Sequence, residues 1–238
     1  MALTARAALE LASHEALVRQ TYKDRVGVLT WCVGMTNATG HRVERYVGNP
    51  APLQHCMNLY VWALRNYAKH VDEVFAGYRL TEAQYAAILS FTWNLGAGAL
   101  RQASWVGHFK AGRLAEAEKA FKTWRMAGGK VVQGLVTRRA LEADLLFRGK
   151  WSNDGTIIEY TRLRSNMQVD FASAKRVNVT AELRNAFAGE RKPIVDEVPQ
   201  PDAPVETPTL SPKPNAASLV AIIVAAILGF IGWRFSQA

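Results

Sequence analysis

The chain has 238 residues, of which 49% are hydrophobic, and its formal net charge is +9. An apolar fraction near one half excludes a chain that is disordered throughout, and it is sufficient for the core of a domain of about 150 residues. The excess positive charge lies in residues 1–152, which carry 20 Lys and Arg against 11 Asp and Glu, whereas the remainder carries nine of each. Such a surface favours a polyanionic partner, which could be nucleic acid, an anionic membrane or an acidic wall polymer, although a merely soluble basic surface explains the charge equally well.

Residues 1–152 are expected to be mainly helical. Residues 4–14 predict a short helix, and the β-branched and aromatic residues of 18–36 predict a compact strand region. In residues 53–75, apolar side chains recur every three to four positions, which is typical of a long amphipathic helix. Three further helices are expected at 81–92, 114–124 and 136–148. Thr81 is the expected N-cap of the first of these, and the fold class is therefore α+β and mainly α-helical.

The sequence beyond residue 152 changes character twice. Residues 153–192 are ambiguous and have no assigned role, although "TIIEYTRL" is compatible with a strand and "TAELRNAF" with a helix. Seven of the nine prolines then fall between Pro193 and Pro214. We therefore expect residues 193–215 to form a stiff, extended linker.

A strongly apolar segment, residues 216–233, follows the linker. Its eighteen positions contain no charged residue, and as a helix they would span roughly 27 Å, just short of a hydrocarbon core of about 30 Å. A buried soluble helix is the alternative, but no domain follows the linker to bury it. We therefore expect a transmembrane helix, in which small residues at Ala221, Ala225 and Gly229 could allow weak helix pairing between copies.

The two cysteines, Cys32 and Cys56, form no CxxC pair and show no His/Cys spacing typical of zinc. We expect free thiols, no metal site and no cofactor. The N-terminal residues Arg6, Glu10 and Glu15 interrupt any apolar signal-peptide core. No cleavable export signal is therefore expected.

Three side chains near the N-terminus have the types and surroundings that glycoside hydrolysis requires. If the first helix ends near Glu15, the helix dipole and the apolar neighbours both favour a protonated carboxyl, as in a general acid. Asp24 lies between Lys23 and Arg25, whose charge favours the ionised carboxylate of a base that activates water. Thr30, on the strand leaving the turn, can hold the same water. Two carboxyls with separated pKa values are typical of a glycosidase, although exposed Glu and Asp are common and the triplet alone is weak evidence.

Three motifs, in matching order and distance, resemble phage-type lysozymes, glycoside hydrolase family 24. Glu15 and Asp24 are separated by eight residues, and Asp24 and Thr30 by five. This spacing resembles the catalytic signature of that family. The segment "AAILSFTWNLGAGAL", residues 86–100, resembles its helix with an Asn-x-Gly turn. Residues 109–147 resemble its C-terminal block of Trp, Gly-Gly, Gly-Leu-x-x-Arg-Arg and Glu.

The resemblance covers residues 1–152 and implies a two-lobed lysozyme-like fold. A small β-hairpin lobe and a larger helical lobe would be joined by the long helix at 53–75, and the cleft between them would bind the glycan strand of peptidoglycan. The resemblance implies catalytic roles for Glu15 as general acid, Asp24 as the residue that activates water or balances charge, and Thr30 as its positioning partner. It implies substrate-binding roles for Asn94, Gly96 and Arg138, with Arg138 approaching the catalytic glutamate.

The chain departs from the family pattern beside the triplet. Where many relatives have Gly-x-Gly-His-Thr, this sequence has Cys32 at the first glycine and Met35 at the histidine, so the contacts and substrate preference of this loop could differ. For Arg138 and Arg139, an ordinary solvated helix face is the alternative to a functional role. For Trp93 and Trp124, packing in the core is favoured over stacking on sugars.

Taken together, the motifs and the tail predict a muramidase tethered to a membrane by residues 216–233. It would hydrolyse the β-1,4 bond between N-acetylmuramic acid and N-acetylglucosamine, as a phage endolysin or a virion-associated lysin. The anchor would lie in the host inner membrane or a virion membrane, with the enzyme acting on the periplasmic cell wall. The alternatives are a lytic transglycosylase, which needs only the glutamate, and a membrane-anchored wall-binding module without turnover. No base-reading motif is present, so no nucleic-acid partner is expected.

Overall fold

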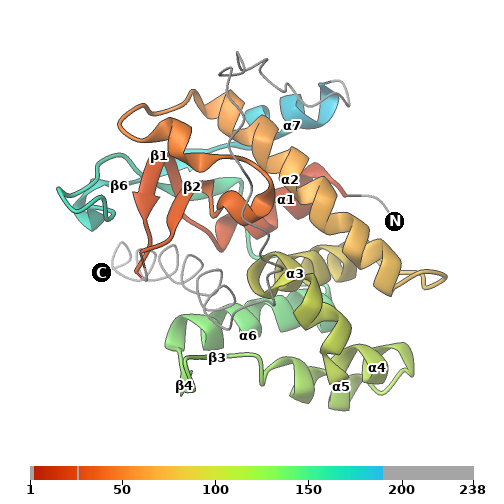
Figure 1. The fold of residues 1–238 in the computed structure, drawn as a ribbon. Helices are drawn as coiled ribbons and strands as arrows, with labels where there is room; N and C mark the ends of the chain where they lie inside the picture. The colour runs from red at the N-terminus through yellow and green to blue at the C-terminus, as the bar shows by residue number, and fades with distance from the viewer. Residues whose placement is uncertain (1–2, 26, 190–238) are drawn as a thin grey trace, which may run out of the picture.

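The computed structural model describes residues 3–25 and 27–189. The expected linker at 193–215 and the expected membrane span at 216–233 lie outside the described residues. Within the described part of the chain, no helix is both long enough and apolar enough to cross a membrane. The fold is α+β and mainly helical, as the sequence predicts, with a sheet on one side and a group of helices on the other (Figure 1).

The chain begins with a capped helix followed by a hairpin. Helix α1, Ala5–Ser13, begins where the Thr4 hydroxyl accepts a hydrogen bond from the Ala7 N–H, and it buries its apolar face. Strands β1, Leu17–Lys23, and β2, Leu29–Val33, pair antiparallel, and the register shifts between Val18 and Tyr22. These elements confirm the short helix and the strand region that the sequence predicts.

A four-stranded sheet forms around this hairpin, with the strand order β2-β1-β5-β6. Strand β5, Thr156–Tyr160, lies parallel to β1 with Leu17 opposite Glu159, and β6, Ala174–Asn178, pairs antiparallel with β5. Helix α7, Thr180–Ala188, follows and packs against α1 and α2. Residues 153–189, which have no role assigned from the sequence, therefore complete the sheet that carries the hairpin.

The helical part is built around two long helices. Helix α2, Leu53–Val74, runs from the sheet toward the other helices, and α3, Glu82–Gln102, packs beside it (Figure 1). A capping box at Thr81 and Gln84 confirms the predicted start of α3. This helix continues past residue 92, where the prediction ends, and its backbone leaves helical angles at Gly96. The remaining helices are α4 Ser104–Lys110, α5 Leu114–Phe121 and α6 Gln133–Arg148.

Short elements connect these parts. They are the 3-10 turns Asn37–Thr39, Val43–Tyr46 and Phe171–Ser173, and the paired strands β3 Met126–Ala127 and β4 Lys130–Val131.

The cysteines are joined in a disulfide, so the expectation of free thiols is wrong. Cys32 on β2 and Cys56 on α2 are both fully buried, with their Cα atoms 5.7 Å apart. The hairpin packs on the first turns of α2 and brings together two residues 24 positions apart in sequence. Spacing alone carries no information about this contact, which depends on the tertiary packing.

The apolar interior has two parts. The larger core lies between the helices and the inner face of the hairpin, and includes Trp31, Tyr60, Phe91 and Trp105. A smaller cluster lies between β1 and the segment after residue 153, and consists of Ala16, Val18, Tyr22, Ile158, Tyr160 and Val169 with Leu163 against it. The hairpin is therefore packed on both faces.

Candidate active site

Glu15 follows the C-terminal end of α1, where its N–H donates to the Ala12 carbonyl and its side chain is only 3% exposed. Burial raises the pKa of Glu15, and the nearby charge of Glu142 raises it further, whereas Arg138 opposes the shift. The net direction is upward, because burial disfavours the ionised carboxylate. This is the direction that a general acid requires.

A buried guanidinium holds one oxygen of this carboxylate. Arg138 on α6 donates from Nη1 to Glu15 Oε1 at 2.7 Å and from Nε to Glu142 Oε1 at 2.9 Å. Its Nη2 contacts the hydroxyl and the carbonyl of Ser90 on α3, at 3.2 and 3.3 Å, and the Ser90 hydroxyl in turn donates to Glu142. Arg138 thus links the end of α1 to both α3 and α6.

The neighbouring guanidinium extends this network toward the middle of α3. Arg139 donates from Nη2 to Asn94 Oδ1 at 2.9 Å and forms an ion pair with Glu142 Oε2 at 2.8 Å. Both arginines are 1% exposed, so the alternative of a solvated helix face is wrong for Arg138 and Arg139. The two buried guanidinium groups are tolerated here because both bind the Glu142 carboxylate and because Arg138 and Arg139 also donate to Glu15 and Asn94 respectively.

A glycine leaves room for the carboxylate on the opposite side. A Cβ atom on Gly34 would lie 3.0 Å from Glu15 Oε2 and 3.5 Å from the indole nitrogen of Trp93. Gly34 also has φ +71°, which favours glycine. Glu15 is therefore held between Arg138 on one side and the backbone of the loop after β2 on the other.

The departures from the family pattern have a structural explanation. Cys32 has φ 56°, a left-handed conformation that favours glycine, and its disulfide to Cys56 holds it there. Met35 is fully buried and exchanges two backbone hydrogen bonds with Trp31. Both substituted positions thus contribute to the packing of the loop.

Asp24 lies in the turn between β1 and β2, as expected, but is 1% exposed. Its Oδ1 accepts a hydrogen bond from the Val28 N–H at 2.8 Å, and its backbone closes the turn through Val28 and Gly27. Thr30 is fully buried on β2, directly opposite Tyr22 on β1. The structure thus places Asp24 and Thr30 on one hairpin.

Tyr22 connects the three residues of the triplet and is not predicted from the sequence. Burial raises the pKa of Tyr22, and the charges of Glu15 and Asp24 raise it further, so the phenol lies within electrostatic range of both carboxylates. It also shares a hydrogen bond with the Thr30 hydroxyl. Tyr22 stays protonated and can therefore donate a hydrogen bond inside the site.

Two more buried side chains belong to the site, although the sequence assigns them no role. Glu142 is the glutamate that ends the motif in residues 109–147, and in the structure it is fully buried and binds both arginines. His14, beside Glu15, is 2% exposed, and its pKa is lowered well below the ordinary value by burial and by the two arginines. His14 is therefore neutral and adds no charge to the network.

The remaining predicted residues lie on α3 with different exposure. Asn94 is 1% exposed, and its Nδ2 has no hydrogen-bond partner among the described residues. Gly96, at φ 85°, breaks the helix two residues later. Trp93 is buried against Tyr60 and Tyr67, which confirms that it packs in the core. Trp124 is half-buried and packs against the core at Phe91.

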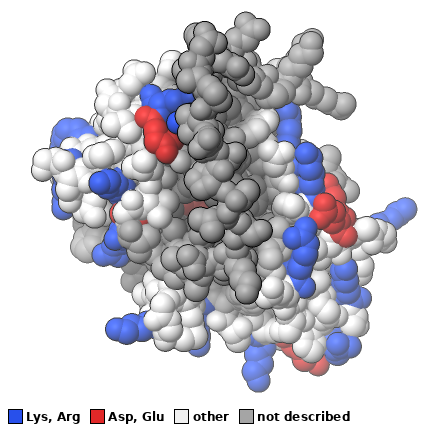
Figure 2. Space-filling model, in the orientation of Figure 1, with Lys and Arg blue, Asp and Glu red and all other residues white. Residues whose placement is uncertain are grey.

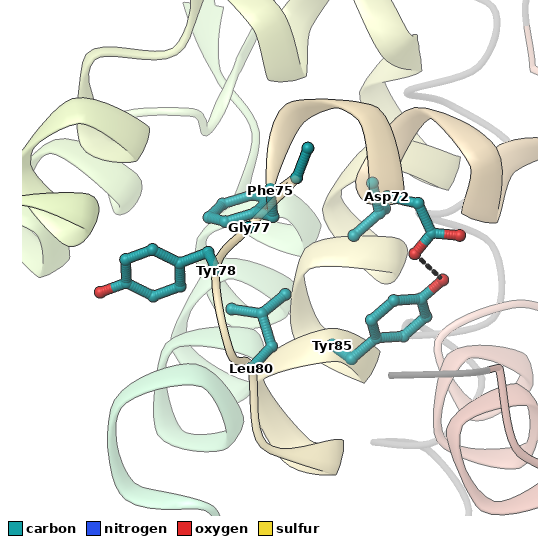
Figure 3. Close-up of a pocket in the computed structure, with 8 residues that line it drawn as sticks. Asp72, Phe75, Gly77, Tyr78, Leu80 and Tyr85 are labelled. Atoms are coloured by element: carbon teal, nitrogen blue, oxygen red, sulfur yellow. Dashed lines mark hydrogen bonds between the residues drawn. The ribbon is translucent and has the colours of Figure 1, made fainter.

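Two cavities lie outside this network of buried side chains. One of about 300 Å³ lies at the C-terminal end of α2, where Tyr85 donates to Asp72 and Tyr78 and Leu80 line the opening (Figure 3). It contains none of the predicted catalytic residues. The other, of about 250 Å³, is lined by Asp24 and by residues of the segment after β5.

Positive charge is dispersed over the surface of the molecule (Figure 2). On the face shown in Figure 2, Lys and Arg side chains are spread around the rim of the molecule. Within residues 3–25 and 27–189, no three His, Cys, Asp or Glu side chains converge as a metal site would require. The arrangement can thus supply a protonated carboxyl, a second carboxylate and hydroxyl donors.

The site falls within a region that matches a known family. A family model described as phage lysozyme matches residues 12–142, more than half of the chain. An SAR-endolysin of Bacteriophage PS119 is 31% identical over 136 residues, which are 57% of this chain and 78% of that protein. An endolysin of Bacillus phage PZA is 43% identical over 74 residues, 31% of this chain, and the match spans only 29% of that relative.

Solved structures agree on the fold. An endolysin from Escherichia coli O157:H7 phage FAHEc1 matches with a TM-score of 0.58 at 22% identity, covering 64% of this chain and 98% of that one. The muramidase domain of SpmX from Asticaccaulis excentricus matches with a TM-score of 0.53 at 24% identity, covering 61% and 97%. The predicted lysozyme-like α+β fold is confirmed.

Proposed function

We propose that this chain, which belongs to the phage lysozyme family, is a muramidase of glycoside hydrolase family 24 that degrades peptidoglycan. It hydrolyses the β-1,4 bond between N-acetylmuramic acid and N-acetylglucosamine. The observation that carries the proposal is Glu15, a buried carboxyl with a raised pKa at the end of α1. The hairpin beside it supplies a second carboxylate at Asp24, so both groups of a glycosidase are present.

In the proposed reaction, protonated Glu15 donates its proton to the glycosidic oxygen as the bond from that oxygen to the anomeric carbon breaks. The Asp24 carboxylate balances the positive charge that develops on the sugar and takes a proton from the attacking water. The water oxygen then bonds to the anomeric carbon. Thr30 positions this water, and proton exchange with solvent restores both carboxyls.

Arg138 has two tasks in this scheme. It stabilises the Glu15 carboxylate that remains after proton donation, through the 2.7 Å hydrogen bond. It also fixes which oxygen of Glu15 carries the proton, because Oε1 accepts from Arg138 and only Oε2 is left to act as acid. Asn94 and Gly96 contribute to substrate binding, and the Asn94 Nδ2 is available to donate to a sugar oxygen.

A lytic transglycosylase is the closest alternative, since that reaction needs only an acid/base glutamate. It would leave Asp24 and Thr30 without a task, although both are buried on the hairpin next to Glu15. This observation favours hydrolysis. A wall-binding module without turnover is also disfavoured, because binding alone does not require a carboxyl with a raised pKa such as Glu15.

The test is mass spectrometry of the fragments that the full chain releases from purified peptidoglycan, compared with Glu15→Gln and Asp24→Asn. Reducing N-acetylmuramic acid ends that are lost in both variants support the proposal. Anhydro ends would identify a transglycosylase and remove the role of Asp24. Binding without any fragment would leave the wall-binding module.

We further propose that residues 216–233 tether the enzyme to a membrane, in the host inner membrane or a virion, while the catalytic domain acts on the periplasmic cell wall. The support is the uncharged eighteen-residue segment behind a proline-rich stretch. A phage endolysin or virion-associated lysin fits this arrangement, with weak pairing of the helices and no nucleic-acid partner. Sedimentation of the full chain with vesicles, but not of a chain ending at residue 192, is the expected result.

A further inference from the structure

The cavity of about 250 Å³ is shared between the catalytic hairpin and the segment after β5. The hairpin side is lined by Lys23, Asp24 and Arg25, and the other side chiefly by Arg164, Gln168 and Phe171. The family match ends at residue 142, so half of this cavity comes from a part of the chain that the family model does not cover.

Backbone hydrogen bonds hold the two walls together. The Lys23 N–H donates to the Met167 carbonyl at 2.9 Å, directly beside Asp24. The far wall is a turn closed by the Arg164 N–H, which donates to the Gln168 carbonyl at 2.7 Å. Met167 within it has φ 64°, a conformation that a non-glycine residue adopts only when its surroundings enforce it. The walls are therefore fixed before any ligand binds.

The floor of the cavity is fixed by the smaller apolar cluster. Val169 is 2% exposed and packs in that cluster with Tyr22 of the catalytic hairpin. Leu163 forms an isolated antiparallel bridge with Val169, which closes the base of the turn. The cavity thus has a rigid base that is continuous with the hairpin carrying Asp24.

The cavity has an excess of unpaired positive charge. Lys23, Arg25 and Arg164 form no ion pair with any residue that the structure describes. Asp24 is the carboxylate among the lining residues, and Asp170, which is paired with Arg162, lies within electrostatic range of Arg164. Neighbouring cations in the same segment are paired, for example Arg162 with Asp170 at 2.9 Å. Three cations and one carboxylate therefore line the cavity, and this net positive charge favours an anionic ligand.

An aromatic ring orients the cation on the far wall. The Arg164 guanidinium carbon lies 5.9 Å from the centre of the Phe171 ring, within the range of a cation–π contact. Phe171 itself packs edge-on against Tyr160, at 5.6 Å between ring centres. Arg164 therefore has a supported position from which its two donors can bind a carboxylate in the paired geometry that guanidinium favours.

We propose that this cavity binds a carboxylate of the short peptide that peptidoglycan carries on its N-acetylmuramic acid, with Arg164 as the main binding residue. This inference rests on the proposed function. The cavity is smaller than the 300–1,000 Å³ of sites that enclose whole ligands, so it fits a side group of the polymer rather than the glycan strand. Its contact with Asp24 places that group beside the sugar whose bond is cut.

The experiment measures binding and cleavage separately, using the full chain. Binding is measured by calorimetry with a disaccharide that carries its peptide and with the same disaccharide lacking the peptide. Cleavage is measured on intact peptidoglycan and on peptidoglycan whose peptides an amidase has removed. The variants are Arg164→Gln, Arg164→Lys and the matched control Arg184→Gln, which removes the same charge from an exposed position on α7.

We expect Arg164→Gln to weaken binding of the peptide-bearing disaccharide about tenfold, as for the loss of a charge-assisted hydrogen bond, and to lower kcat/KM on intact peptidoglycan similarly through KM. Binding of the peptide-free disaccharide and cleavage of stripped peptidoglycan should change less than about twofold. Arg164→Lys should recover part of the loss, and Arg184→Gln should behave as the wild type.

Equal losses with and without the peptide would overturn the inference, because Arg164 would then act on the glycan or on the fold. The inference would also be overturned if poly(glycerol phosphate) competed for the pocket as strongly as the peptide and if this competition required Arg164. The ligand would then be a phosphate. If the wild type cleaves neither substrate but binds the peptide through Arg164, the proposed function fails and the pocket stands. If the wild type and Arg164→Gln cleave intact peptidoglycan equally well, the proposed function stands and the inference about the pocket fails.

Discussion

Replacing Gly34 by alanine should damage catalysis far more than it damages folding. The new methyl carbon would lie 3.0 Å from Glu15 Oε2, closer than such contacts normally allow. The carboxylate cannot simply move aside, because its Oε1 is held by Arg138 at 2.7 Å. The oxygen proposed to carry the proton is therefore the atom that must shift.

The magnitude follows from two separate effects. Alanine in a left-handed conformation costs about 1–2 kcal/mol of folding free energy. Gly112→Ala is a matched control, because Gly112 has φ +73° against +71° for Gly34, and a Cβ there has no atom within 4 Å. Both variants should lose this backbone contribution, and Gly34→Ala should lose somewhat more stability because its Cβ also crowds the buried carboxylate. Displacing an acid by a few tenths of an ångström should lower kcat only in Gly34→Ala, by roughly 10- to 100-fold.

The assay is the rate of release of reducing ends from purified peptidoglycan, combined with thermal unfolding of both variants. A loss of kcat confined to Gly34→Ala supports the packing of Gly34 against the acid. Equal activity in the two variants, at equal loss of stability, would refute the geometry described for Glu15. Replacement of Arg138 is a poorer probe, because it removes a charge as well as a contact.

Three further results are expected. Glu142→Gln should move the alkaline limb of the pH profile of kcat to lower pH, because the charge of Glu142 adds to burial in raising the pKa of Glu15. The same change should destabilise the fold by about 3–5 kcal/mol. An alkaline limb that does not move would contradict this reasoning. Folding lowers the pKa of His14, so the free energy of unfolding should be constant above about pH 6.5 and should fall below that pH by up to about 1.4 kcal/mol per pH unit. His14→Gln should remove this slope, as measured by urea unfolding of both proteins. Reductant should lower the free energy of unfolding by about 3 kcal/mol through the Cys32–Cys56 bond, whereas a variant with serine at both positions should show no response.

Local signals predicted the elements that position the acid. Thr4 and Thr81 are caps whose hydroxyls sit at the starts of α1 and α3. The end of the first helix, placed near Glu15 from the sequence, is observed at Ser13, and the apolar neighbours of Glu15 correctly indicate an upward pKa shift. These features depend on residues within one or two turns of chain, so the sequence contains what is needed.

Features that depend on distant residues could not be obtained in this way. Arg138 and Arg139 resemble an exposed helix face by spacing, and only the approach of α1 and α3 buries them. The glycines after Asn94 suggest the end of a helix, yet only Gly96 leaves helical geometry. Arg164 has no local feature that distinguishes it from other exposed arginines until its turn meets the catalytic hairpin.

The parallel pairing of β1 with β5 also determines when the hairpin can reach its final packing during synthesis of the chain. Arg19 on β1 forms its ion pair with Glu159, 140 residues later in the chain. Until that residue leaves the ribosome, the nascent hairpin has neither the neighbouring strand nor the apolar cluster that covers Val18 and Tyr22. Contacts of this range form late in folding. A growing chain therefore carries Glu15 and Asp24 long before it can hold them in place, and the hairpin reaches its final packing only after β5 has been translated.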